Sequence, residues 1–297
     1  MSARDLGLLA MVCVLWGANF LAIKFALTGT TPLMMITIRF LIVVVLLAPW
    51  IAPRPERLGR VVLVAILFGP LHFGALFTAL SRVNASTVAL VLLSYVPLSV
   101  TFSMLMLGER PGPRRLAGIV IACAGTVVIA FGPDLALDPF GVAAAFVAAA
   151  GMALATVLMP TLGPVGPLKL QGWISLVSLP IGLAGTVAFE GSDLPARVAA
   201  MTPPAWFGVL YTGVFGSVVA HGTFYRVVTR NEVTLAAPTT LLATLIGAVL
   251  GVVVLGEPVT PQMVGGAGIA LAGLFLLLWR QVGRRLPQVE QGAPAER

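Results

Sequence analysis

The stretch LGERPGPRRLAGIVIACAG at residues 107–125 recurs 148 residues later as LGEPVTPQMVGGAGIALAG at residues 255–273. Both copies begin Leu-Gly-Glu and then keep a proline, two glycines and an isoleucine at matching places. The same register extends towards the N-terminus over about three hydrophobic segments, so one hydrophobic unit is written twice. The further matched pairs are Gly74 with Gly222, Arg82 with Arg230, Pro113 with Pro261, Gly118 with Gly266, Ile121 with Ile269 and Gly125 with Gly273.

The composition indicates a polytopic membrane protein. Of the 297 residues, 59% are hydrophobic and only 10% are charged, and the mean hydropathy is +1.03. A helix needs about 20 apolar residues to cross a hydrocarbon layer of about 30 Å. Unbroken apolar runs without period-two alternation favour helices over a barrel. We predict spans at residues 6–27, 32–50, 58–80, 86–107, 114–131, 139–159, 168–189, 204–228, 233–255 and 261–279.

Five spans in each copy predict two halves of opposite orientation. Because five is odd, the second copy must enter the membrane from the other side. The predicted fold is therefore an all-α polytopic membrane protein of ten transmembrane helices arranged as two inverted five-helix repeats, typical of alternating-access transporters. The first repeat is expected at residues 1–133, the second at 134–285, and a disordered cytoplasmic tail at 286–297.

The positive charges predict the orientation. The net charge of +7 could suggest nucleic acid, but the placement of the charges gives a better explanation. Of the 18 lysines and arginines, Lys24 and Arg39 lie within spans, Arg82 and Arg197 lie in outer loops, and the rest lie on the inner side if the N-terminus is inside. The positive-inside rule then predicts that both termini are cytoplasmic, and no nucleic-acid partner is expected.

Several short motifs of the first half resemble the drug/metabolite transporter superfamily, in particular its ten-span EamA-type family. They are Trp16-Gly17-Ala18-Asn19-Phe20 with Lys24, Pro32 and Arg39-Phe40, then Ala79-Leu80, Leu90 to Leu93 before Pro97, and Leu107-Gly108-Glu109 with Gly118 and Gly125. The second half departs from them, since it has Ala150-Gly151 in place of the Trp-Gly pair and Leu245 in place of Pro97.

The resemblance implies export of small metabolites across a bacterial inner membrane. The sequence is similar to the YddG-type exporters, whose cargo is aromatic or neutral amino acids. Substrate identity is the property that transfers least well between proteins of one fold. Export of other small metabolites or drugs is the alternative, and a non-transporting membrane scaffold or receptor is a further one.

Ionisable residues within spans are costly and so become candidates for function: Lys24, Arg39, His72, His221 and Arg226. Lys24 and Arg226 lie near span ends and are expected to snorkel. For Arg39 the alternatives are a structural bond to helix-end carbonyls, capture of a substrate carboxylate, or an outer gate contact. Each histidine is either a substrate or proton-coupling group or a buried ring satisfied by a neighbour.

Polar and aromatic stripes at helical spacing are expected to face the interior. Ser217, His221, Phe224 and Tyr225 share one face, and Thr87, Ser94 and Thr101 recur every seven residues. We predict a wet, aromatic cavity, while interhelical hydrogen bonding and packing is the alternative role. The predicted substrate-binding residues are Trp16, Asn19, His72, Phe77, Ser94, Tyr95, Ser217, His221 and Tyr225.

Prolines and glycines mark places where helices bend or approach closely. Gly69-Pro70, Pro97, Pro180 and Pro238 interrupt backbone hydrogen bonding within spans, as hinges or as static bends. We assign gating or hinge roles to Arg39, Pro70, Pro97 and Pro238. The glycines of the repeated stretch are expected to serve packing or a dimer face. Glu109 and Glu257 are expected to shape helix connections, with gate contacts to arginines as the alternative.

Catalysis is disfavoured by what the spans lack. No carboxylate lies near a span midpoint, and neither Cys13 nor Cys123 has a partner pattern for a metal or a disulfide. A nucleophile with an acid or base partner is also missing, so we expect no enzyme, no cofactor and no metal. The expected partners are a small neutral or zwitterionic substrate and the lipid bilayer, for a monomer or homodimer. A passive channel differs from a carrier only in its transport kinetics.

Overall fold

The computed structural model describes residues 3–108, 112–131, 138–230 and 236–278, and these are helical or lie in short connections. The first part of the chain contains six helices, in which α3 runs through the π-helical segment η1 into α4, and α5 runs through the 3₁₀ turn η2 into α6. The elements are α1 Ala3–Ala26, α2 Pro32–Ile51, α3 Leu58–Ile66, η1 Leu67–Phe73, α4 Gly74–Arg82, α5 Ala85–Val91, η2 Leu92–Ser94 and α6 Tyr95–Leu107.

The rest of the chain repeats this pattern of long helices with short irregular segments. A second long π-helical segment, η5, joins α11 to α12, and the shorter π-helical η4 ends α9. The elements are α7 Pro113–Ala130, α8 Pro139–Leu158, η3 Met159–Leu162, α9 Pro167–Gly185, η4 Thr186–Glu190, α10 Leu194–Ala199, α11 Pro203–Leu210, η5 Tyr211–Val219, α12 Ala220–Arg230, α13 Ala236–Leu255 and α14 Pro261–Leu278.

The long apolar runs predicted from the sequence form these helices. Within the described ranges, 9 helical stretches are long and apolar enough to cross a membrane, and residues Thr239–Leu255 form a shorter apolar helix. Large apolar side chains such as Leu105, Val253 and Phe189 are exposed, as expected of a surface that faces lipid. The chain is thus a polytopic helical membrane protein. Glu109 and the predicted tail 286–297 lie outside the described residues.

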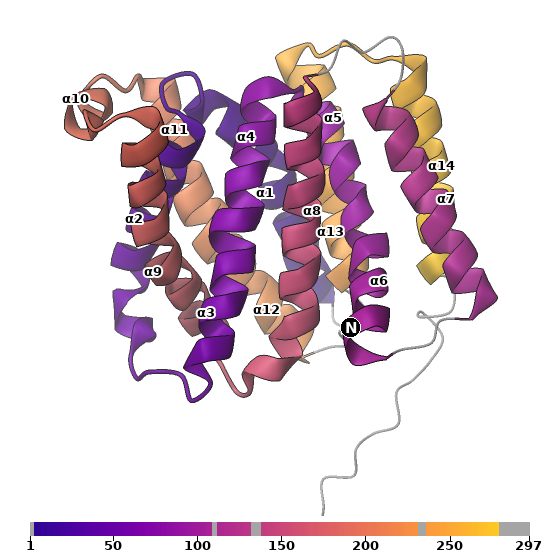
Figure 1. Cartoon of the computed structure of the whole chain (residues 1–297), viewed down its shortest axis with the longest axis horizontal. Coiled ribbons are helices and arrows are strands. Elements are labelled where there is room, and N and C mark those ends of the chain that lie inside the picture. Colours follow the sequence, from indigo (N-terminus) through magenta and orange to yellow (C-terminus); the bar gives the residue numbers. More distant parts are fainter. Residues whose placement is uncertain (1–2, 109–111, 132–137, 231–235, 279–297) are drawn as a thin grey trace, which may run out of the picture.

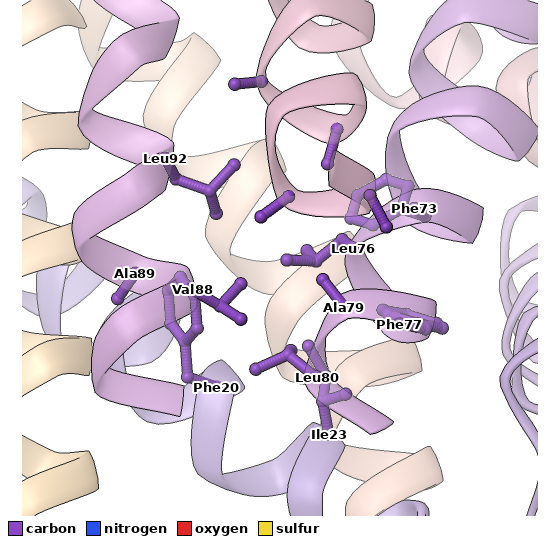
Figure 2. Close-up of a cluster of buried hydrophobic side chains, with 14 of the residues drawn as sticks. Phe20, Ile23, Phe73, Leu76, Phe77, Ala79, Leu80, Val88, Ala89 and Leu92 are labelled. Carbon is purple, nitrogen blue, oxygen red and sulfur yellow. The ribbon is translucent and has the colours of Figure 1, made fainter. Parts of the chain in front are cut away.

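Helices far apart in sequence pack side by side. α7 packs along α14 at one end of the molecule, and α2 packs along α9 at the other end (Figure 1). Between these pairs, α1 contacts α13, and α8 contacts both α4 and α6. A hydrophobic cluster fills the space between α1, α4 and α5 (Figure 2); it includes Phe20, Ile23, Leu76, Phe77, Ala79, Leu80, Val88 and Ala89.

The glycines of the repeated stretch bring α7 and α14 into backbone contact. A Cβ at Gly125 would lie 2.2 Å from the Ala270 amide nitrogen, and one at Gly273 would lie 2.3 Å from the Ala122 nitrogen. A Cβ at Gly118 would lie 2.9 Å from the Gly273 oxygen, and one at Gly266 would lie 2.8 Å from the Gly125 oxygen. These glycines therefore pack the two helices of one chain together, as the packing alternative predicted.

Carboxylates cap three helix N-termini at one end of the bundle, and two of these carboxylates come from other segments. Glu190 accepts hydrogen bonds from the Leu33 and Met34 amides of α2, both at 2.9 Å. Glu257 accepts from the first two amides of α5, and Asp138 caps α8 while pairing with Arg82 at 2.7 Å. A carboxylate at a helix N-terminus satisfies free N–H groups and the helix dipole together.

Candidate substrate site

Arg39 is a buried cation in the interior of the molecule. Its side chain is 1% exposed, and it lies on the second turn of α2. Its Nε and Nη2 groups donate to one atom, the Ser217 hydroxyl oxygen, at 3.1 Å and 2.9 Å. Its Nη1 atom is buried without a hydrogen-bond partner. The bond to Ser217 replaces the helix-end carbonyls that we considered as structural partners.

Three phenylalanine rings surround the Arg39 guanidinium. Its Cζ atom lies 3.6 Å from the centroid of the Phe73 ring, 5.2 Å from Phe40 and 5.6 Å from Phe77. A guanidinium over an aromatic face gains about 0.5–2 kcal/mol. Removing an unpaired charge from water costs several kcal/mol, so these rings compensate only part of the desolvation.

The backbone around Ser217 orients its hydroxyl towards Arg39. Ser217 lies in the π-helical segment η5 and donates its own hydrogen to the Thr212 carbonyl, five residues earlier, at 2.8 Å. Its lone pairs therefore remain available to accept from Arg39. π-Helical turns inside α-helices occur frequently at functional sites.

His72 and His221 both contact the ring of Phe68. The Phe68 centroid is 5.4 Å from the His72 ring, which stacks on it, and 5.9 Å from the His221 ring, which meets it edge-on. His72 is also 4.6 Å from Phe73, the ring under Arg39. Both histidines therefore belong to the same cluster as the buried arginine.

Each histidine is oriented by a backbone carbonyl. The Nδ1 atom of His72 is 2.7 Å from the Ala148 oxygen of α8, and that of His221 is 2.8 Å from the Gly216 oxygen. Because a carbonyl only accepts, both Nδ1 atoms must carry the proton. In a neutral ring with this tautomer, the Nε2 atom is a hydrogen-bond acceptor.

Trp16 of α1 closes one side of the cluster. Its indole nitrogen donates to the Gly216 oxygen at 3.2 Å, and its ring lies 5.0 Å from both His221 and Phe224. Asn19, one turn further on, is half-buried next to Gly216, where a Cβ would lie 2.7 Å from its Oδ1 atom. That Oδ1 atom is buried and has no hydrogen-bond partner.

The predicted site residues are thus only partly brought together. Trp16, His72, Phe77, Ser217 and His221 join one cluster around Arg39, and Asn19 borders it. Ser94 is buried but donates to the Val91 carbonyl of its own helix at 2.7 Å, and Tyr95 is half-buried with Thr156 of α8 as its hydrogen-bonding neighbour. The side chains of Tyr225 and Pro238 lie outside the described part of the chain.

The backbone is irregular at two of the predicted hinge prolines. Pro70 lies within η1, and Pro97 follows the 3₁₀ turn η2 at the start of α6. Proline removes a backbone donor, which accounts for a local change of helix type. Their role as hinges stays a prediction.

Sequence reasoning overlooked three phenylalanines as site residues. Phe40, Phe68 and Phe73 all contact members of the cluster, whereas Phe77 and Phe224 are among the residues predicted to face the interior. Phe68 lies four residues before His72, and Phe40 directly follows Arg39, so proximity to buried ionisable residues was the available signal.

The described residues contain no group of three or more His, Cys, Asp or Glu side chains that could hold a metal ion. Among those same residues, the buried polar side chains include Arg39 and both histidines but no carboxylate. The cluster thus combines hydrogen-bonding groups and one cation with aromatic rings, which is chemistry suited to hydrogen bonds and ring contacts.

Comparisons with known proteins agree with this architecture. A probable amino-acid metabolite efflux pump of Salmonella typhimurium is 28% identical over 97% of this chain and 99% of its own length. A probable amino-acid metabolite efflux pump of Escherichia coli is 25% identical over 95% of this chain and 98% of its own. One solved crystal structure superimposes on this chain with a TM-score of 0.65. The match spans 96% of this chain and 100% of the other chain at 20% sequence identity, which shows likeness of fold.

The EamA-like transporter family matches residues 5–131 and residues 139–279, which is most of the chain. The multi-span helical fold and the bacterial efflux-pump relatives are those of an inner-membrane protein. The chain therefore belongs to the EamA-like family of the drug/metabolite transporter superfamily, and it is a transporter and not an enzyme.

Proposed function

We propose that this protein exports small zwitterionic metabolites, above all neutral and aromatic amino acids, by alternating access through the cluster around Arg39. The observation that carries the proposal is the composition of that cluster. It joins α1, α2, η1 and α4 to η5 and α12, and it combines buried hydrogen-bonding groups with aromatic rings. A zwitterion with an apolar side chain is complementary to such surroundings.

The proposed architecture is ten spans in two inverted repeats, residues 1–133 and 134–285, with both termini in the cytoplasm. Two separate matches to one family, at 5–131 and 139–279, support a duplicated unit. Packing between corresponding helices of the two copies, α2 with α9 and α7 with α14, supports a pseudo-two-fold relation. The charge bias of the loops supports the orientation.

The cluster's location supports rocking of helix bundles around it. Its members come from both proposed repeats, and substrate sites of inverted-repeat transporters lie at the repeat interface. Glu190, Glu257 and Asp138 of the second proposed repeat bond to α2, α5 and Arg82 of the first, which supports an interface between the two repeats at the predicted outer end. The absence of a buried carboxylate among the described side chains argues against lipophilic cations as cargo.

The test is uptake into proteoliposomes of labelled phenylalanine, tyrosine, tryptophan, leucine, threonine and methionine, with and without an imposed pH gradient. We expect saturable uptake that unlabelled cargo competes, because a carrier binds its substrate at each turnover. A response to the pH gradient would indicate proton coupling through a histidine, and no response would indicate facilitated exchange.

Variants locate the transport site. His72→Ala and His221→Ala should lower uptake while membrane insertion is retained, because both rings face the cluster. Gly265→Ala is the control, since no atom lies within 4 Å of the added Cβ. Wild-type rates in both histidine variants would contradict the site. No uptake of any amino acid by folded protein would contradict the substrate class and favour other metabolites or a scaffold.

A further inference from the structure

We infer that the free edge of the Arg39 guanidinium is the anchor for a carboxylate of the cargo, so that transport requires a carboxylate and rejects its amide or amine analogues. This inference rests on the proposed transport function and specifies the ligand chemistry of its site.

The hydrogen bonds of Arg39 leave one edge of its planar guanidinium group without a partner. A guanidinium has five N–H donors in a planar arrangement. The Nε–H and one Nη2–H are used by Ser217. Both Nη1–H groups lack a partner, and Nη1 is buried. The Nη1 and Nη2 atoms therefore present an edge on which a carboxylate can accept two parallel hydrogen bonds.

A purely structural arginine would not be left in this state. Buried charges are normally paired, and a buried polar atom without a partner needs an explanation. The side chain is 1% exposed, its hydrogen-bond acceptor is a neutral hydroxyl, and the described part of the chain places no carboxylate among its buried side chains. An arriving carboxylate would supply both the missing negative charge and the missing acceptors.

The neighbouring rings explain why the anchor would select an amphipathic cargo. Phe73 covers one face of the guanidinium, and Phe77 and Phe40 lie within 5.6 Å and 5.2 Å of its centre. Little water can then compete for the open edge, so a carboxylate bound there gains more than it would in water. The adjoining Phe68, His72 and His221 rings offer contacts to an apolar or aromatic body.

The experiment compares four ligands that share one aromatic body as competitors of labelled phenylalanine in proteoliposomes containing the full chain. Phenylalanine and 3-phenylpropionate carry the carboxylate, whereas phenylalaninamide and phenylethylamine do not. We expect the two carboxylates to compete about tenfold or more better than the two analogues, as the loss of a charge-assisted bidentate pair predicts.

Arginine variants test whether this selectivity resides at Arg39. Arg39→Gln should reduce the preference for carboxylates to less than about twofold, and Arg39→Lys should retain part of it, because lysine keeps the charge but loses the planar fork. Arg60→Gln is the matched control: Arg60 donates to the Thr161 carbonyl at 3.1 Å, outside the cluster, and its loss should leave the preference unchanged.

The outcomes separate the two proposals. Equal competition by phenylalaninamide and phenylalanine against wild-type uptake would overturn the carboxylate anchor while leaving amino-acid transport intact. Selectivity that persists in Arg39→Gln would also overturn it. Absence of phenylalanine uptake by folded wild-type protein would instead contradict the proposed function itself. The wild-type competition needs no variant, so the inference can be refuted even if Arg39→Gln fails to fold.

Discussion

The contact between α7 and α14 makes a strong prediction about stability. In Gly125→Ala, the added methyl group would lie 2.2 Å from the Ala270 nitrogen and 2.6 Å from the Gly266 oxygen. Non-bonded heavy atoms pack best at about 3.5–4.0 Å. The clashing atoms belong to the backbone of α14, so no side-chain rotation relieves the overlap. The two helices must separate by about 1 Å, which loosens every contact along them.

The expected magnitude is the difference of two effects. Alanine is favoured over glycine inside a helix by about 0.5–1 kcal/mol. Overpacking of a well-packed interface costs about 1–3 kcal/mol, and the upper part of this range applies when rigid backbone must move. Gly125→Ala should therefore destabilise the protein by about 1–2 kcal/mol. A bulkier Gly125→Leu should cost more.

The assay measures the midpoint of thermal unfolding in detergent. The signal is the fraction of protein that remains monodisperse after heating. We expect a fall of about 2–4 °C for each kcal/mol. Gly265→Ala and Gly268→Ala are matched controls on α14, because no atom lies within 4 Å of either added Cβ. They should leave the midpoint unchanged or raise it. A Gly125→Ala midpoint equal to those of the controls would refute the backbone contact.

Two carboxylates outside the bundle centre give the remaining predictions. Glu257→Gln should destabilise the protein by about 1–3 kcal/mol in the same heating assay. In the wild type, the backbone N–H groups of Ala85 and Ser86 each donate to a different carboxylate oxygen of Glu257 at 2.7 Å, whereas a glutamine side chain has only one oxygen. Glu56→Gln is the exposed control, and equal midpoints for the two variants would contradict the cap. The hydrogen bond from Arg82 holds the pKa of Asp138 below its usual range, so its contribution to stability is complete above the unfolded value of about 3.9 and is lost as pH falls through the lower folded pKa. Asp138→Asn should therefore lower the midpoint at pH 7 and make it less sensitive to acid below about pH 4; identical profiles from pH 7 to pH 3 would argue against the pairing.

Most of the helical architecture could be predicted from the sequence because the bilayer imposes one strong pattern. Runs of about 20 apolar residues are interrupted by Pro, Gly and charge, and these interruptions coincide with the observed helix ends. The predicted span 32–50 is observed as Pro32–Ile51, and 261–279 as Pro261–Leu278. The glycines of the repeat also predicted a close helix contact, since small residues have few other uses at such spacing.

The site could be predicted less completely because its contacts join distant parts of the chain. Arg39 and Ser217 are separated by 178 residues, and His72 and its acceptor Ala148 by 76. Periodicity indicates which face of a helix is buried but not which side chain on another helix it will meet. The π-helical segment η5 was also missed, since its i to i+5 bonds follow from packing and no proline marks it.

The closely packed helix contacts and the proposed substrate site lie in different regions of this molecule. The α7 and α14 contact is close-packed, and the capping carboxylates satisfy helix N-termini at one end. The central cluster leaves polar atoms of Arg39 and Asn19 buried without partners, and Ser86, Thr87 and Gln171 each have one such atom elsewhere in the described part of the chain. Arg39 differs from these others because its unpartnered atom belongs to a charged group, which is the more costly kind to bury. Under the proposed function, a bound carboxylate would remove this cost, while the closely packed helix pair α7 and α14 would keep its structure.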